Sequence, residues 1–183
     1  VGPDPVVMSI AAGKTIASFE AAFPGAAVVR AMPNTPAQVG RGITAAVGNA
    51  RVREADRALV SALLAAVGDV AWLDDEALID VVTAISGSGP AYVFHFVECL
   101  AEAGEALGLP PELAARFARA TVEGGGELLY QSELSPEQLR KNVTSPGGTT
   151  AAALAVFMAD GALSRLVGEA ALAAKRRSEE LSG

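Results

Sequence analysis

The sequence contains one histidine, one cysteine and few aromatic residues among its 183 positions. With a single histidine and a single cysteine, the chain has few side chains that could form a zinc site, a cysteine nucleophile or a Ser-His-Asp triad, and we expect no metal site. Cys99 cannot form an internal disulfide, and because it lies in an apolar helical pattern we expect it in the core. His95, between Phe94 and Phe96, is expected to have a packing role.

Long apolar runs and an excess of positive charge are also missing. No segment has the length of a membrane span, and none has the basic and apolar pattern of a signal peptide. The net charge of −7 disfavours nucleic acid and anionic membrane surfaces as partners. We therefore expect a cytoplasmic protein that binds neither nucleic acid nor membrane, in which helix N-termini and a few arginines bind anionic ligands locally.

The first part of the chain alternates short apolar runs with helical stretches, which predicts α/β units and a mainly parallel sheet. We expect strands at 6–10, 27–32, 43–47 and 70–73, and helices at 15–22 and 53–67. A dinucleotide-binding domain begins with a strand, a G-x-G-x-x-G turn and a helix, and none of these is present. We expect residues 1–74 to be the C-terminal part of a Rossmann-type dinucleotide-binding domain whose N-terminal half is missing, with a natural short paralogue as the alternative.

After Glu76 the strand pattern stops and the sequence is helical throughout. Helices are expected at 77–85, 90–107, 111–131, 135–142, 151–158 and 162–181. Short turns between helices are typical of a bundle, so we expect residues 75–183 to form an all-helical domain. Its alanine- and glycine-rich apolar faces leave too much surface for one bundle to cover, which predicts a dimer.

Two segments of small polar residues each run into a helical pattern. The first, Val143–Thr150, reads VTSPGGTT. The first N–H groups of a helix have no partner inside it, and glycines allow close approach, so a small carboxylate or phosphate can bind there. The alternative is that Thr149 is only an N-cap after a turn. The second, Ser86–Tyr92, reads SGSGPAY, with Pro90 suited to the first helical position, and it lacks the third glycine and the lysine of phosphate-binding loops.

Four motifs together carry a resemblance to a known family. They are AMPNTP at 31–36, SGSGPAY at 86–92, LGLP at 107–110 and LRKNVTSPGGTT at 139–150. In this order and spacing they resemble pyrroline-5-carboxylate reductase, from about Val6 to the C-terminus. The resemblance implies reduction of 1-pyrroline-5-carboxylate to L-proline, the last step of proline biosynthesis, by hydride transfer from NADPH or NADH. It also implies an incomplete Rossmann-type sheet followed by a helical substrate-binding and dimerisation domain at 75–183, in a homodimer or a higher homo-oligomer.

The resemblance further implies roles for individual residues. The substrate-binding positions are Glu76, Glu133, Gly147, Gly148, Thr149 and Thr150. The backbone N–H groups of Thr149 and Thr150 would hold the carboxylate, and the Thr150 hydroxyl would face the ring nitrogen. Ser88 would line the imine pocket, which makes Thr150 and Ser88 the catalytic positions. The cofactor-binding positions are Ile10, Ala11, Ala12, Asn34, Pro36 and Asn142.

Ordinary structural roles stay open for several of these residues. Glu76 suits the first turn of a helix, where the dipole favours an acid. Ser88 suits an N-cap, and Glu133 suits a solvated loop. Pro33–Pro36 suits a rigid turn after a strand.

Two other functions also stay open. The first is a non-catalytic helical oligomerisation fragment, since a chain without the phosphate-binding turn lacks the usual grip on a dinucleotide. The second is a related keto-acid or 2-hydroxy-acid reductase. Such an enzyme relies on a catalytic lysine, and Lys14, Lys141 and Lys175 lie in no motif that we can match.

Overall fold

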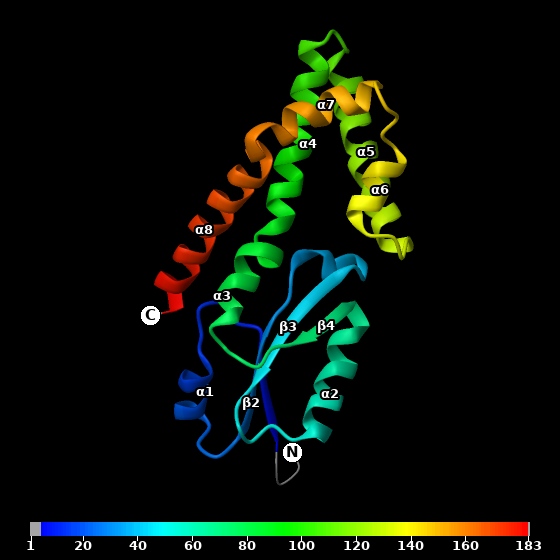
Figure 1. Cartoon of the computed structure of the whole chain (residues 1–183). Coiled ribbons are helices and arrows are strands. Elements are labelled where there is room, and N and C mark those ends of the chain that lie inside the picture. The colour runs from blue at the N-terminus through cyan, green and yellow to red at the C-terminus, as the bar shows by residue number, and fades with distance from the viewer. Residues whose placement is uncertain (1–4, 183) are drawn as a thin grey trace. The chain divides into compact units, whose positions relative to one another are not determined.

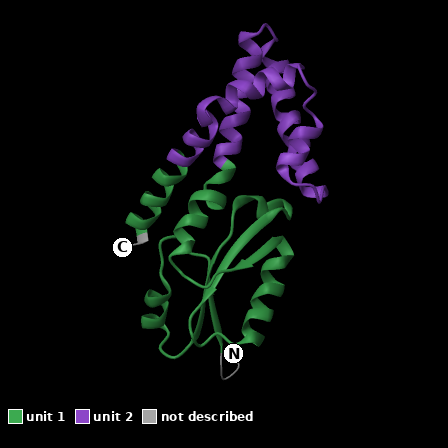
Figure 2. Ribbon diagram, viewed as in Figure 1, with its two compact units in different colours: residues 1–90, 170–183 green, residues 91–169 purple. Residues whose placement is uncertain are grey.

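Residues 5–182 are described by a computed structural model of the chain (Figure 1). They divide into two compact units, one made of the residues up to Pro90 with those from Ala170 onward, and the other of Ala91–Glu169 (Figure 2). The first unit contains a sheet covered by helices, and the second is helical. The expected fold class is therefore confirmed, while the domain boundary expected between residues 74 and 75 stays a prediction.

The sheet of the first unit has four strands in the order β1-β2-β3-β4. Their bounds are Val6–Ser9, Ala27–Met32, Gly42–Gly48 and Gly68–Trp72. β1 and β2 run parallel, as do β3 and β4, but β2 and β3 run antiparallel, so the expected parallel arrangement holds for two of three pairs. The exception arises because residues 33–41 contain only the short 3-10 helix η1, Thr35–Val39, which is too little chain for a parallel crossover.

Successive side chains of β2 pack on opposite faces of this sheet. The covering helices are α1, Ile16–Ala22, α2, Glu54–Leu64, and α3, Leu78–Val82. Val28 packs in one cluster with residues of α1 and α3, and Val29 packs in the other with residues of α2. Both faces of the central strands are buried, which is why their sequences are almost continuously apolar. Arg30 interrupts this run and is nevertheless buried.

Glycine fixes the point where α2 gives way to β4. The expected 53–67 helix is α-helical only to Leu64, continues as the 3-10 helix η2, Ala65–Val67, and stops at Gly68. Gly68 has a φ of 150°, and a Cβ atom there would lie 2.0 Å from the carbonyl oxygen of Gly42. Only glycine fits this conformation and this contact, so β4 can begin beside β3 only at such a residue.

The chain keeps helical backbone angles from α3 into α4, Gly89–Ala106, through a π-helical turn at Thr83–Gly87. The turn expected at Ser86–Tyr92 is therefore wrong, whereas the helix expected to start at Pro90 starts at Gly89, one residue earlier. Ser88 is not an N-cap either, because its φ of −84° and ψ of −24° are helical.

The π-helical turn has a local cause. Pro90 has no N–H to donate to the carbonyl of Ser86, so the α-helical ladder cannot pass this point unchanged. The N–H of Ser88 donates to the carbonyl of Thr83, five residues earlier, at 2.8 Å. Turns of this kind occur frequently at functional sites, and the sequence pattern did not predict this one.

The second unit is made of α4 and the helices that follow it. Their bounds are Pro111–Gln131 for α5, Pro136–Asn142 for α6, Thr149–Met158 for α7 and Ala162–Ser182 for α8, whose last part belongs to the first unit. Among the described residues of this second unit, only Ala114 and Ala118 are buried. Large apolar side chains such as Phe94, Leu107 and Val156 are exposed. These helices therefore carry more apolar surface than one chain covers.

Two sequence expectations fail on α4. Cys99 is exposed and does not lie in the core. His95 is exposed too, with its Nδ1 2.8 Å from Glu98 Oε2 and its Nε2 3.7 Å from the sulfur of Cys99. None of the described residues of α4 is buried, so its apolar pattern does not translate into burial within a single chain.

Residues 149–181 are, by length and composition alone, apolar enough to cross a membrane, which the sequence pattern did not lead us to expect. The stretch is kinked between α7 and α8, at the short 3-10 helix η4, Ala159–Gly161, where Asp160 has a φ of 49°. None of its most apolar part is buried. These side chains therefore add to the exposed apolar surface of the chain.

Candidate functional site

The carboxyl ends of β1 and β2 lie at one edge of the sheet, because the two strands are parallel and in register. Ligands of open α/β sheets bind at this edge. Ile10, Ala11 and Ala12 follow β1 directly and are exposed. The hydroxyl of Ser9 accepts a hydrogen bond from the N–H of Ala11 at 3.1 Å, which fixes the start of this segment. The three residues are therefore accessible to a ligand, and their predicted contact with a cofactor stays a prediction.

Asn34 and Pro36 lie just beyond the end of β2. Asn34 precedes η1, and its Oδ1 accepts a hydrogen bond from the N–H of Ile43 at 3.0 Å. Pro36 lies in the first turn of η1. The structure thus gives Pro33–Pro36 the rigid turn that local sequence also favoured, while the predicted cofactor contacts stay untested.

A cavity of about 350 Å³ lies in the first unit. It is lined by residues of the sheet edge, the π-helical turn and the end of α8, among them Ala12, Arg30, Met32, Thr83, Ser88 and Ser178. The hydroxyl of Thr83 donates to the carbonyl of Ile79 at 2.8 Å, and the hydroxyl of Ser178 donates to Asp80 at 2.5 Å. Within residues 5–182, no hydrogen bond uses the hydroxyl of Ser88. The Ser88 hydroxyl is therefore the only one of the three described hydroxyls lining this cavity that is free to bind a ligand.

Arg30 is a residue of this region that the sequence analysis missed. Its Nη1 lies 2.8 Å from Oε1 of Glu76, and the two side chains are 6% and 30% exposed. The same oxygen accepts a hydrogen bond from the N–H of Ile16, at the start of α1, at 2.8 Å. Glu76 therefore caps α1 and not its own helix. A single charged residue inside the apolar run AVVRAM was the signal that could have identified Arg30.

The predicted carboxylate site lies in the second unit, at the start of α7. Gly148 is the N-cap and Thr149 is the first helical residue, so the alternative that Thr149 is an N-cap is wrong. The N–H of Gly148 donates to the carbonyl of Ser145 at 3.0 Å, and Gly147 has a φ of 70° that suits glycine. Within the described part of the chain, the N–H groups and hydroxyls of Thr149 and Thr150 have no hydrogen-bond partner. This end of α7 can therefore accept an anion.

Glu133 precedes α6, and Asn142 is the last residue of that helix, in the same unit. Glu133 is exposed in the link before the helix. Ser135 caps α6, since its hydroxyl accepts the N–H of Gln138 at 3.2 Å, as the sequence predicted. The side chain of Gln138 does not close a capping box but donates to Oδ1 of Asn142 at 2.8 Å. The roles predicted for Glu133 and Asn142 stay predictions.

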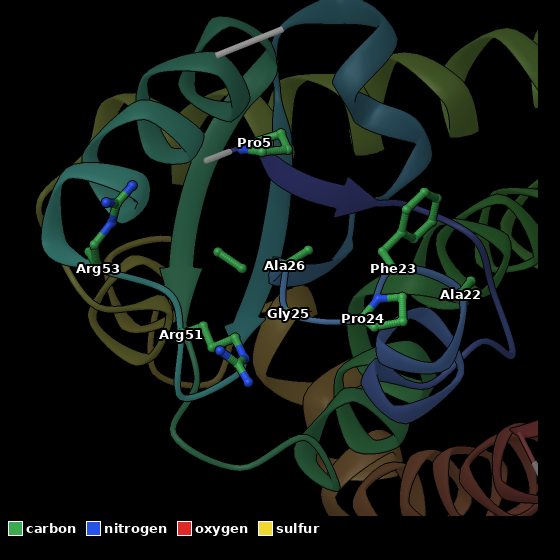
Figure 3. Close-up of a pocket in the computed structure, with 9 residues that line it drawn as sticks. Pro5, Ala22, Phe23, Pro24, Gly25, Ala26, Arg51 and Arg53 are labelled. Atoms are coloured by element: carbon green, nitrogen blue, oxygen red, sulfur yellow. The ribbon is translucent and has the colours of Figure 1, made fainter. Parts of the chain in front are cut away.

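A second cavity of the first unit, of about 540 Å³, lies at the opposite ends of the same strands (Figure 3). Pro5, which precedes β1, lines it together with Phe23 and Arg51. Arg53 also lines it, but its Nε binds Oδ2 of Asp56 at 2.9 Å, and this bond holds the pKa of Asp56 below its usual value. No predicted site residue lines this cavity, so we do not assign the site to it.

Comparison with known proteins agrees with the resemblance seen in the motifs. Residues 76–181 match the family description "Pyrroline-5-carboxylate reductase dimerisation". The chain is 47% identical over 181 residues to a pyrroline-5-carboxylate reductase of Pseudomonas aeruginosa and 46% identical over 177 residues to one of Synechocystis. These alignments cover 98% and 97% of the chain but 66% of each relative, so the chain spans just under two thirds of their length.

Solved structures show the same similarity in three dimensions. A pyrroline-5-carboxylate reductase of Coxiella burnetii superimposes with a TM-score of 0.92 at 41% identity, over 97% of this chain and 66% of that one. A pyrroline carboxylate reductase of Plasmodium falciparum with NADP bound superimposes with a TM-score of 0.81 at 33% identity, over 97% of this chain and 71% of that one. The shared motifs, the family match and these structures together show that the chain belongs to the pyrroline-5-carboxylate reductase family.

Proposed function

We propose that this chain carries the substrate-binding and subunit-pairing part of an enzyme that reduces 1-pyrroline-5-carboxylate to L-proline with NADPH or NADH. The observation that carries the proposal is the start of α7. There the N–H groups of Thr149 and Thr150 have no partner among the described residues, beside a glycine turn that a ligand can approach. In a chain of this family, such a helix start suits the carboxylate of the substrate.

The charges of the substrate suit a chain with a net charge of −7. A cyclic imine is protonated before it accepts hydride, so its iminium and carboxylate charges nearly cancel. The start of α7 would hold the carboxylate and the Thr150 hydroxyl would face the ring nitrogen. Ser88 is proposed to line the imine pocket, and Glu76 and Glu133 stay proposed as further substrate-binding residues. The iminium charge disappears on reduction, so a group at the nitrogen contributes mainly to the transition state. An imine that is already protonated needs no general acid from the protein.

The nicotinamide cofactor would supply the hydride when bound. The residues present fit the cofactor at the carboxyl edge of the sheet. Ile10–Ala12 are exposed there, and Ala12 and Ser88 line the same cavity. Asn34 and Pro36, held in their rigid turn, are proposed to bound the nicotinamide, and Asn142 is proposed as a further contact. These positions would lie near the reactive ring, so they do not select between NADPH and NADH.

The exposed apolar helices of the second unit predict self-association. Leu107 is 89% exposed, Val156 73% and Phe94 64%, which is more apolar surface than a monomer usually leaves open. We expect sedimentation of the chain at micromolar concentration to show a dimer or a larger homo-oligomer. Phe94→Lys should weaken this association and make the unfolding temperature depend more strongly on concentration.

Glu102→Lys is the matched control, because Glu102 is an exposed polar residue of the same helix. This variant should associate as the unchanged chain does. A stable monomer that unfolds cooperatively at micromolar concentration would contradict the prediction.

A helical oligomerisation fragment without catalysis is the second candidate function, and the same exposed surface favours it. Cytoplasmic location and the absence of membrane or nucleic-acid partners stay predictions.

The proposed activity is tested by joining the chain, in frame, to a preceding nucleotide-binding half that carries G-x-G-x-x-G. We expect NADPH or NADH oxidation that requires 1-pyrroline-5-carboxylate and yields one L-proline per nucleotide oxidised. A folded protein that binds nucleotide but forms no proline would contradict the proposal. Reduction of a keto acid in place of the imine would favour the related reductase.

A further inference from the structure

Glu76 lies where three segments of the proposed site meet. Its Oε1 accepts hydrogen bonds from the N–H of Ile16 and from Nη1 of Arg30, each at 2.8 Å. Ile16 begins α1 directly after the 10–15 segment, and Arg30 lies two residues before the end of β2. Glu76 itself precedes α3 and the π-helical turn that leads to Ser88.

We infer that Glu76 and Arg30 are positioning residues that hold the cofactor-side segment 10–15 against β2 and α3. This inference rests on the proposed function, because it assigns the segment a cofactor contact. Both bonds end on one oxygen atom, so a movement of either β2 or α1 against Glu76 disturbs one of the two bonds. One carboxylate therefore sets the relative placement of residues that are distant in sequence.

The surroundings of Arg30 show why this arrangement is specific. Its neighbours on the same face of β2 are Val28 and Met32, and its partner in the register with β3 is Val47. The side chain of Arg30 is only 6% exposed, so its charge depends on Glu76 for compensation. A region that served packing alone would be filled by apolar residues, as the rest of this face is. An ion pair of fixed geometry specifies one arrangement where apolar contacts tolerate several.

The location of the pair agrees with a role beside the site. Arg30 lines the cavity of about 350 Å³ that Ala12 and Ser88 also line. The start of α1 is fixed by two side chains, because Glu76 accepts the N–H of Ile16 while Thr15 accepts the N–H of Ser18 at 3.3 Å. The 10–15 segment thus has its far end held by Glu76 and its near end held by the Ser9 hydroxyl.

Hydrogen exchange on the full chain tests the local part of the inference. We expect Glu76→Ala to speed exchange about tenfold or more at residues 10–19, while the amides of α2 exchange unchanged. Glu76→Gln should have a smaller effect, because the amide oxygen can still accept the N–H of Ile16. Asp74→Asn is the matched control, since Asp74 is an exposed acid two residues away and its change removes the same charge. Equal exchange at residues 10–19 in Glu76→Ala and Asp74→Asn would overturn the inference.

Kinetics of the chain joined to a nucleotide-binding half test the functional part. We expect Glu76→Ala and Arg30→Met to raise the KM for NADPH about tenfold or more, and the KM for the imine less, with Arg30→Lys intermediate. A merely structural pair would lower the amount of active enzyme, and so the apparent kcat, without moving the KM for NADPH. An unchanged KM for NADPH would therefore overturn the inference even if exchange is faster. If the unchanged enzyme reduces no imine, the proposed function fails, and direct titration with NADPH together with the exchange result still decides the inference.

Discussion

The 183-residue chain on its own is expected to reduce 1-pyrroline-5-carboxylate at about a thousandth, or less, of the rate of the same chain joined to a half that carries G-x-G-x-x-G. The sequence contains no G-x-G-x-x-G turn for the pyrophosphate, and none of the residues proposed to contact the cofactor would replace it. Such a turn binds the pyrophosphate through the N–H groups at a helix start, and this is the main binding contact of the fold with a dinucleotide. A thousandfold loss corresponds to roughly 4 kcal/mol of transition-state stabilisation.

The measurement compares kcat/KM of the two proteins at equal subunit concentration, with nucleotide binding measured separately by titration. Circular dichroism serves as the control that the shorter chain is folded. Rapid, imine-dependent NADPH oxidation by the 183-residue chain alone would show that the carboxyl edge of its sheet binds the cofactor without a pyrophosphate turn.

Thr150→Val is the second large effect that we expect. The change keeps the shape of the side chain but removes the hydroxyl proposed to face the imine nitrogen, and no bond within the described residues uses that hydroxyl. Because the hydroxyl would act mainly as reduction proceeds, kcat/KM should fall about ten- to a thousandfold, roughly 1.4 to 4 kcal/mol. Steady-state kinetics in the nucleotide-competent enzyme measure the fall, and inhibition by L-proline should weaken much less.

Gly148→Leu provides the contrasting variant. A Cβ atom at Gly148 would lie 3.2 Å from the carbonyl oxygen of Ser145, and a longer side chain would cover the start of α7. We expect this change to weaken L-proline binding and to raise the KM for the imine, since it obstructs the carboxylate. Wild-type efficiency of a folded Thr150→Val enzyme would mean that Thr150 is only a helix residue and that the imine nitrogen lies elsewhere.

Much of the local structure follows from the sequence because its boundaries are marked by proline and glycine. The strand at 27–32 and the helix at 111–131 have the predicted bounds, the first between Pro24-Gly25 and Pro33 and the second beginning at Pro111. The cap of α6 by Ser135 was also predictable from its spacing to Gln138. Each of these signals acts within a few residues, so a single sequence contains it.

The features that escaped prediction depend on distant partners. Glu76 binds Ile16, 60 residues away, and Arg30, 46 residues away. A local sequence pattern does not predict contacts over such separations. The antiparallel pairing of β2 with β3 is an exception, because its cause is the short connection at 33–41, which lies within the local sequence. Cys99 was expected to be buried because its helix is apolar, but an apolar pattern predicts a covered face without saying which molecule covers it.

The close packing at the start of β3 and β4 limits how this chain can tolerate mutation. A Cβ atom at Gly68 would meet the backbone of Gly42 at 2.0 Å, and a Cβ atom at Gly42 would meet Ala37 at 2.9 Å. Three small residues from three segments therefore depend on one another for space, although none is a proposed ligand contact. In a library of single substitutions selected for stable protein, both glycines should be as depleted of variants as a catalytic residue, and depletion there would reveal backbone geometry, not chemistry.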